Sequence, residues 1–207
     1  MPQVSFDDLV TKAVAGESLI SFPTDTVPAL ATRPDRAELI FEAKQRSLDK
    51  PLILMAGAIA DLWPFVAGNP QERQEWEAIA ERYWPGALTL VLPASDRIPA
   101  AMNPKDPTTI GVRVPDHAIA RAILARTGPL ATTSANLSGQ PPLLTLAEIE
   151  QQFPQVLTLL PSELQRLAKS TPRREEELVA SGIPSTVIRW TPTGWEVLRQ
   201  GAVTVSF

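Results

Sequence analysis

The chain has 207 residues, no cysteine and one histidine, His117. The lack of cysteine excludes disulfides, thiolate metal sites and cysteine nucleophiles, and it is typical of a cytosolic protein. A serine triad or a histidine metal site would have to be built around His117. This residue follows Pro115-Asp116 at what resembles the start of a helix, which favours a surface or capping role. The sequence therefore offers little for nucleophilic catalysis.

Long apolar runs and an excess of positive charge are also missing. No run of about 18 apolar residues is present, so no membrane span is expected. The early acids Asp7 and Asp8 do not fit a signal peptide, and we expect a cytoplasmic protein without membrane contact. The net charge is −4, whereas dedicated nucleic-acid binders carry a basic excess. RNA is disfavoured as the main ligand, although a local basic face remains possible.

Several familiar fingerprints are absent as well. The sequence has no G-x-x-x-x-G-K-[ST] and no G-x-G-x-x-G, which excludes a Walker loop and a Rossmann dinucleotide site. It has no G-x-S-x-G nucleophile elbow and no carboxylate pair typical of a glycosidase. No carboxylate cluster predicts a protein-held metal, so we expect any Mg²⁺ to arrive with a nucleotide.

Three short polar segments, each attached to an apolar run, carry the positive evidence. Thr24-Asp25-Thr26 follows the run 19–22, and Thr133-Ser134-Ala135-Asn136 follows 130–132. The third segment, 44–50, places Lys44, Arg46 and Lys50 before the run 51–55. Hydroxyls at strand ends and clustered cations suit a phosphorylated ligand. Taken singly, each segment also fits an ordinary turn or a basic last helical turn, and these alternatives stay open.

Hydrophobic periodicity and caps predict alternating helices and strands. Helices are expected at 5–16, from 34 to near 44, and at 70–83, 116–126 and 145–153. Strands are expected at 18–22, 52–55, 87–92, 110–114, 129–132, 185–190 and 195–198, the last two joined as a hairpin. We find no repeat and no linker. The pattern therefore predicts a single α/β domain, 1–207, with a mixed sheet.

Taken together, the polar segments and their surroundings resemble the YrdC-like family, the threonylcarbamoyl-AMP synthases of tRNA modification. The resemblance covers about 5–201. It rests on these stretches, in this order: Phe22-Pro23-Thr24-Asp25-Thr26-Val27, Lys44-Gln45-Arg46, Asp49-Lys50-Pro51-Leu52, Trp84-Pro85-Gly86-Ala87-Leu88-Thr89-Leu90-Val91, Gly111-Val112-Arg113-Val114-Pro115-Asp116-His117, Thr133-Ser134-Ala135-Asn136-Leu137-Ser138-Gly139, Pro184-Ser185-Thr186-Val187 and Leu198-Arg199-Gln200-Gly201.

The resemblance implies a fold and a reaction. The expected fold is a twisted mixed sheet flanked by helices around a positively lined cavity. The expected enzyme is a nucleotidyltransferase that joins L-threonine, bicarbonate and ATP into threonylcarbamoyl-AMP and releases pyrophosphate. A downstream transferase would then move the threonylcarbamoyl group onto an adenosine of tRNA.

The resemblance also implies roles for single residues. Lys44, Arg46 and Lys50 are expected to be catalytic, with Arg46 and Lys50 on the ATP phosphates. Threonine would be bound by Thr26, Arg113, Thr133 and Ser185. Ser134, Asn136 and Arg199 would bind the nucleotide.

This chain departs from the family pattern at three places. Pro28 stands where tyrosine is frequent, Met55 stands where many members have histidine, and the segment 173–182 is charged where glycine is usual. These departures keep an alternative open, a YrdC-like protein that binds nucleotide or double-stranded RNA without making the adenylate. A related carbamoyl-transfer enzyme is a remoter alternative.

Overall fold

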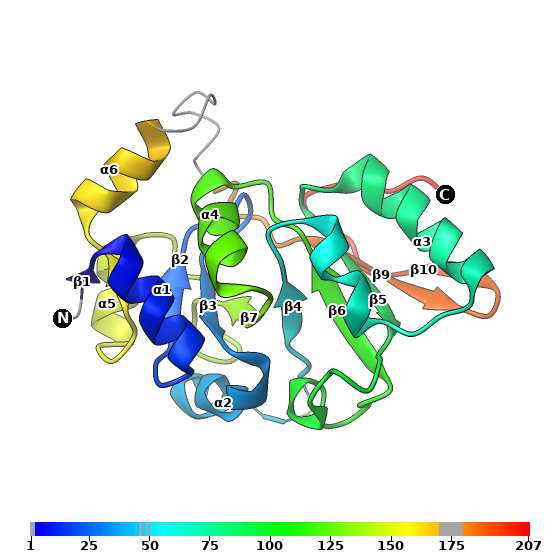
Figure 1. Ribbon diagram of the computed structural model, residues 1–207, viewed down its shortest axis with the longest axis horizontal. Coiled ribbons are helices and arrows are strands. Elements are labelled where there is room, and N and C mark those ends of the chain that lie inside the picture. Colours follow the sequence, from blue (N-terminus) through cyan, green and yellow to red (C-terminus); the bar gives the residue numbers. More distant parts are fainter. Residues whose placement is uncertain (1–2, 46, 49, 170–179) are drawn as a thin grey trace.

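A strongly mixed β-sheet forms the centre of the molecule (Figure 1). The computed structural model describes residues 3–45, 47–48, 50–169 and 180–207. Within them, eight strands follow the order β10-β9-β5-β6-β4-β7-β3-β2. The pairs β4–β6 and β5–β9 are parallel and the other neighbours are antiparallel. The predicted α/β fold with a mixed sheet is therefore confirmed.

The elements alternate along most of the chain. The strands of the main sheet are β2 (Ile20–Phe22), β3 (Ala29–Thr32), β4 (Ile53–Met55), β5 (Leu88–Pro93), β6 (Thr109–Arg113), β7 (Leu130–Ser134), β9 (Thr186–Thr191) and β10 (Gly194–Arg199). A separate parallel pair joins β1 (Gln3–Val4) and β8 (Thr158–Leu159). The helices are α1 (Phe6–Ala15), α2 (Glu38–Lys44), α3 (Pro70–Tyr83), α4 (Ala118–Thr127), α5 (Leu146–Gln152) and α6 (Pro161–Lys169).

Local sequence signals fix several helix ends. The Ser5 hydroxyl accepts a hydrogen bond from the backbone N–H of Asp8, and Gly16 ends α1 in the left-handed conformation. Reciprocal capping boxes start α3 and α5, and the second of them, Thr145 with Glu148, follows the predicted pattern. These caps satisfy backbone groups that would otherwise lack partners at the helix ends.

One face of the sheet packs into the main hydrophobic core. Leu54, Leu90, Val112 and Ile188 lie in this core with apolar side chains of α2 and α3. These four residues are neighbours in the strand register. Successive side chains of a strand point to opposite faces, so the residues between them lie on the other face.

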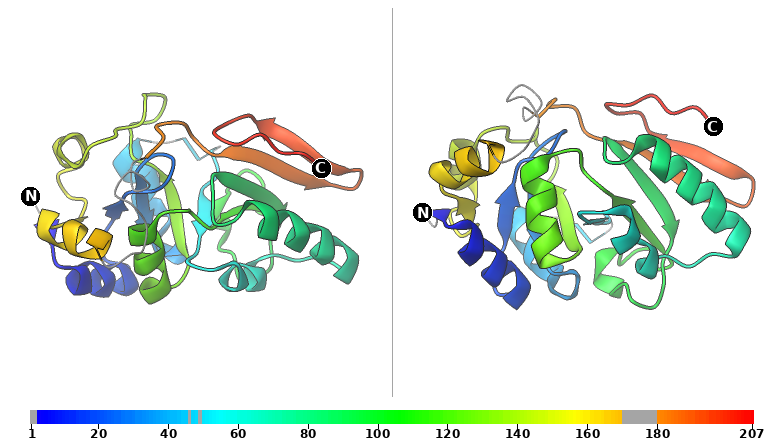
Figure 2. Two further views of the ribbon diagram at one scale, coloured as in Figure 1. Left: turned by 90° about the horizontal axis from the view of Figure 1, so that it is seen from above. Right: turned by 45° about the horizontal axis from the view of Figure 1, so that its top comes forward.

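That other face is covered over only part of its width. Helices α1 and α4, side by side in Figure 1, pack with β2 and β3 in a second core that includes Phe22, Ala31 and Met55. The β9–β10 hairpin lies at one end of the molecule, and α5 and α6 lie at the other (Figure 2). The part of the face between these ends is where a cavity forms.

Some expectations need correction. Strand β3 and helix α6 lie where no element was predicted, and the helix expected from 34 begins with a short 3₁₀ turn before α2. His117, not Asp116, occupies the N-cap of α4, and its side chain is buried and makes no capping bond, so a surface role is wrong. Among the described helices, none is long and apolar enough to span a membrane.

Candidate active site

A cavity of about 790 Å³ opens on the uncovered face of the sheet. Alternate residues of four neighbouring strands line it: Ile53 and Met55 from β4, Thr109, Gly111 and Arg113 from β6, Thr89 and Val91 from β5, and Val187 and Arg189 from β9. The period of two follows from the pleat, because the intervening residues fill the main core. The volume suits a ligand of the size of a nucleotide.

The cavity brings together most of the residues predicted from sequence. Eight of the ten line it, namely Thr26, Lys50, Arg113, Thr133, Ser134, Asn136, Ser185 and Arg199. They come from separate segments of the chain that the sheet topology brings together. Arg46 and most of the segment 173–182 lie outside the described residues.

Arg113 ends β6 at one end of the cavity and is almost fully buried. Its Nη1 donates to the Thr26 hydroxyl at 2.9 Å, its Nη2 to Asp25 Oδ1 at 2.7 Å, and its Nε to the Gly86 carbonyl at 3.0 Å. Burial lowers the pKa of Arg113, and the Asp25 carboxylate opposes that shift. Asp25 therefore bonds to Arg113 across the fold rather than capping only its own turn.

Ser185 is held beside this end of the cavity. Its hydroxyl lies 2.9 Å from the hydroxyl of Thr89, and both side chains are buried. Arg199 donates from Nη2 to the Ser185 carbonyl at 2.8 Å, so the last strand is tied to the start of β9. Burial lowers the pKa of Arg199. This arrangement places a second guanidinium near Arg113.

The structure also places Lys44, which was predicted to be catalytic. It does not line the cavity but is completely buried at the end of α2, beneath the loop that follows β7. Its ammonium donates to the Ser134 carbonyl and, at 3.2 Å, to Asn136 Oδ1. The Ser134 hydroxyl also donates to Asn136 Oδ1, at 2.5 Å. Lys44 therefore holds Ser134 and Asn136 in place by hydrogen bonds.

Asn136 fixes the same loop from its other side. Its Nδ2 donates to the carbonyls of Leu137 and Gln140 at 2.8 and 2.6 Å. Lys50, which also lines the cavity, donates to the Ser138 hydroxyl at 3.1 Å. Ser134 belongs to β7 itself, because the strand runs two residues further than predicted. These hydrogen bonds fix the conformation of the loop after β7.

Sequence reasoning missed part of the rim. Lys105, Asp106 and Arg189 also line the cavity. The described lining contains two lysines and three arginines but one acid, Asp106, so positive charge exceeds negative charge there. Lys105 lies in a segment predicted only as a loop. For Arg189, the only sequence signal is that it stands two positions after Val187 on the same predicted strand and therefore on the same face.

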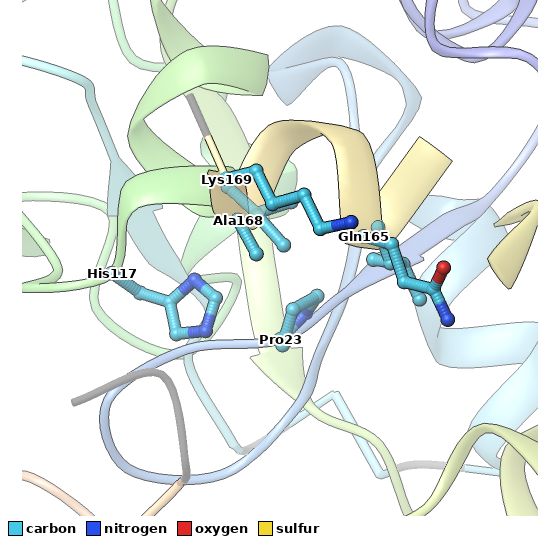
Figure 3. A pocket seen from close by; sticks show the side chains of 7 residues that line it. Pro23, His117, Gln165, Ala168 and Lys169 are labelled. Atoms are coloured by element: carbon cyan, nitrogen blue, oxygen red, sulfur yellow. The ribbon is translucent and has the colours of Figure 1, made fainter. Parts of the chain in front are cut away.

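No group of three metal-ligating side chains is present in the described ranges, which leaves the source of Mg²⁺ a prediction. A smaller hollow of about 540 Å³ lies elsewhere, with Pro23 and His117 facing residues of α6 (Figure 3). None of the predicted site residues lines it.

A mixed α/β sheet with a cation-lined cavity favours the class of proteins that bind a small anionic ligand. Comparison with known proteins narrows this class. The family model for Sua5, YciO and YrdC proteins, described as "Telomere recombination", matches residues 12–201. The chain belongs to this family, and the predicted resemblance is confirmed.

Two curated relatives carry the name threonylcarbamoyl-AMP synthase. The protein of Vibrio campbellii is 35% identical over 148 residues, which are 70% of this chain and 79% of the relative. The protein of Bacillus subtilis is 38% identical over 130 residues, 59% of this chain and 36% of the relative.

A solved structure of P. abyssi Sua5 complexed with L-threonine has a TM-score of 0.76 and 29% identity. The similarity covers 95% of this chain and 54% of the P. abyssi chain. The chain therefore spans about half of that protein, and the likeness of the fold extends over nearly all of the present chain.

Proposed function

We propose that this chain is a nucleotidyltransferase that makes threonylcarbamoyl-AMP from L-threonine, bicarbonate and ATP. The names of the curated relatives support this function over a non-catalytic nucleotide- or RNA-binding protein. The observation that carries it is the convergence of eight predicted site residues on one cavity lined by cations.

Threonine would lie at the Arg113 end of the cavity. A guanidinium matches a carboxylate with parallel N–H donors, and Arg113 is buried where water competes little. Thr26, Thr133 and Ser185 would surround the amino acid with hydroxyls. The relative from P. abyssi, whose structure holds L-threonine, supports this choice of substrate.

ATP would occupy the rest of the cavity. Lys50 and Arg46 would hold the phosphates. Ser134, at the end of β7, and Asn136, in the loop that follows, would bind the nucleotide. Arg199 would close over it. Mg²⁺ would arrive with ATP and neutralise phosphate charge. Thr109 lies four positions before Arg113 on β6, so the two ends of the cavity lining on this strand are about 13 Å apart at about 3.3 Å per residue.

The reaction then needs positioning more than a strong base. The threonine amine takes up bicarbonate and releases water, which leaves a carbamate. A carbamate oxygen forms a bond to the α-phosphorus of ATP while the bond from that phosphorus to the bridging oxygen breaks, and pyrophosphate leaves. Fixed cations stabilise the charge that develops on the phosphates. A downstream transferase would pass the threonylcarbamoyl group to tRNA.

Lys50→Ala tests the phosphate role. We expect kcat/KM for ATP to fall about tenfold or more, because a hydrogen bond to a charged group contributes about 1.5–3 kcal/mol. Lys12→Ala, an exposed lysine on α1, is the matched control and is expected to keep wild-type activity. Arg46→Ala should resemble Lys50→Ala. Full threonine-dependent pyrophosphate release by both variants would contradict the assignment.

A further inference from the structure

Asp25 and Arg113 form an ion pair at the edge of the cavity. Nη2 of Arg113 lies 2.7 Å from Asp25 Oδ1, and the two side chains are 3% and 16% exposed. Arg113 lines the cavity, whereas Asp25 is not among the described residues that do so. The carboxylate therefore contacts the guanidinium without itself lining the described cavity.

The hydrogen bonds of Arg113 leave part of its donor set for a ligand. A guanidinium carries five N–H groups. In the described part of the chain, three of them bond to Gly86, Thr26 and Asp25. Each Nη nitrogen thus keeps one N–H that a carboxylate in the cavity can accept. The orientation of these two donors depends on the three bonds already made.

Asp25 is itself held in place independently of Arg113. Its Oδ1 accepts a second bond from the backbone N–H of Asp116 at 3.1 Å. Its carbonyl accepts from the N–H of Ser181 at 3.0 Å, and the Thr26 carbonyl accepts from Gly182 at 2.8 Å. A fixed carboxylate can orient its partner, whereas a mobile one would follow it.

Charge gives Asp25 a second effect. Burial and the nearby Arg199 cation both lower the pKa of Arg113, while Asp25 raises it. Without Asp25, the buried Arg113 guanidinium would lie near the Arg199 cation and would lose its counter-charge. The pair therefore gives the buried guanidinium a counter-charge and a fixed partner before any ligand enters.

We propose that Asp25 is a positioning residue that orients the Arg113 guanidinium to receive the carboxylate of the amino-acid substrate. The inference rests on the proposed function for the identity of that substrate. It assigns Asp25 no contact with the reacting atoms. Its effect belongs to recognition of the carboxylate and not to binding of the nucleotide.

The test compares Asp25→Ala with Asp25→Asn, which keeps an oxygen acceptor of the same shape. We expect Asp25→Ala to raise KM for L-threonine about tenfold or more, because a misaligned guanidinium loses its paired donors. KM for ATP should stay within about twofold, and Asp25→Asn should restore most of the threonine affinity. Asp35→Asn, which breaks the exposed pair of Asp35 with Arg33, is the matched control.

A second measurement compares the affinities for L-threonine and for L-threoninol, which lacks the carboxylate. A general loss of structure would lower both affinities and would not change their ratio. Asp25→Ala should lower the preference for threonine over threoninol. An unchanged preference, or equal rises in KM for threonine and ATP, would overturn the proposal. If Asp25→Ala does not fold, Asp25→Ser serves instead, since its hydroxyl can still accept from Asp116. Failure of the wild type to release pyrophosphate would instead refute the proposed function, and wild-type threonine binding separates the two cases.

Discussion

At the scale of single residues, the site depends on partners far apart in the sequence. Asp25 and Arg113 are 88 positions apart, and Lys44 and Asn136 are 92 apart. In each pair, a charged side chain that does not line the cavity fixes a polar side chain that does. Recognition of a ligand is thus prepared by contacts that the ligand itself does not make.

Lys44→Met tests the position in which the structure places this lysine. Methionine keeps the length of the buried stem but cannot donate to Ser134 and Asn136. We expect the free energy of unfolding to fall by about 1–3 kcal/mol, because acceptors in the loop lose a charged donor. KM for ATP should rise, while KM for threonine changes little.

Denaturant unfolding and steady-state kinetics measure both effects. A variant with unchanged stability and a large loss of kcat would contradict a role beneath the loop. That result would favour the direct contact with phosphate that the sequence alone suggested for Lys44.

At the scale of elements, prediction succeeded where local signals agree. The helix α3 has the predicted bounds, because Pro70 follows a capping asparagine and the apolar stripe contains Trp76, Ile79 and Ala80. The hairpin of β9 and β10 was also predicted, from the turn 191–194. For these elements, local sequence signals are enough to predict where each one begins or ends.

Elements stabilised by tertiary pairing were missed. Strand β3 consists of Ala29, Leu30, Ala31 and Thr32, and its two alanines are poor strand formers, yet it pairs with both β2 and β7. Eight of ten predicted site residues nevertheless reached one cavity, because the motifs stand at strand ends and in adjoining loops. The contacts of Asp25 with Arg113 and of Lys44 with Asn136 could not be predicted, since they depend on the strand order.

The contact between the end of β10 and the start of β9 gives a prediction at this scale. A Cβ at Gly201 would lie 2.3 Å from the Pro184 carbonyl oxygen and 2.5 Å from that of Ser185. Both are backbone atoms, so Gly201→Ala must displace the segment that presents Ser185. We expect a loss of about 1–3 kcal/mol in the free energy of unfolding, typical of overpacking.

The same displacement should raise KM for threonine more than KM for ATP, because Ser185 is assigned to threonine. Thermal or denaturant unfolding and kinetics of Gly201→Ala measure these changes. Wild-type stability together with wild-type KM values would show that the close packing of 184–185 on 201 does not position the site.

At the scale of the whole molecule, the charge is unevenly distributed. The chain carries a net charge of −4, yet five cations and one acid occur in the described lining of the cavity. A concave surface of one sign focuses its field and attracts a ligand of opposite charge. An anionic substrate is thus favoured inside the cavity although the protein as a whole repels it.

Salt should therefore weaken nucleotide binding. Raising the ionic strength from about 0.05 to about 0.5 M shortens the screening length to well below the width of the site. We expect Kd for ATP to rise several-fold while the melting temperature changes little. Titration calorimetry of ATP at several salt concentrations checks this. An affinity independent of salt would mean that the lining cations do not contact the phosphates.

The central claim is that this cavity joins threonine to AMP. Pyrophosphate release from purified protein with ATP, Mg²⁺ and bicarbonate, with and without L-threonine, tests it most directly. The account predicts release that requires L-threonine and is weaker with serine. Absence of release from folded protein that still binds ATP would contradict it, and double-stranded RNA binding and its salt dependence would be measured next.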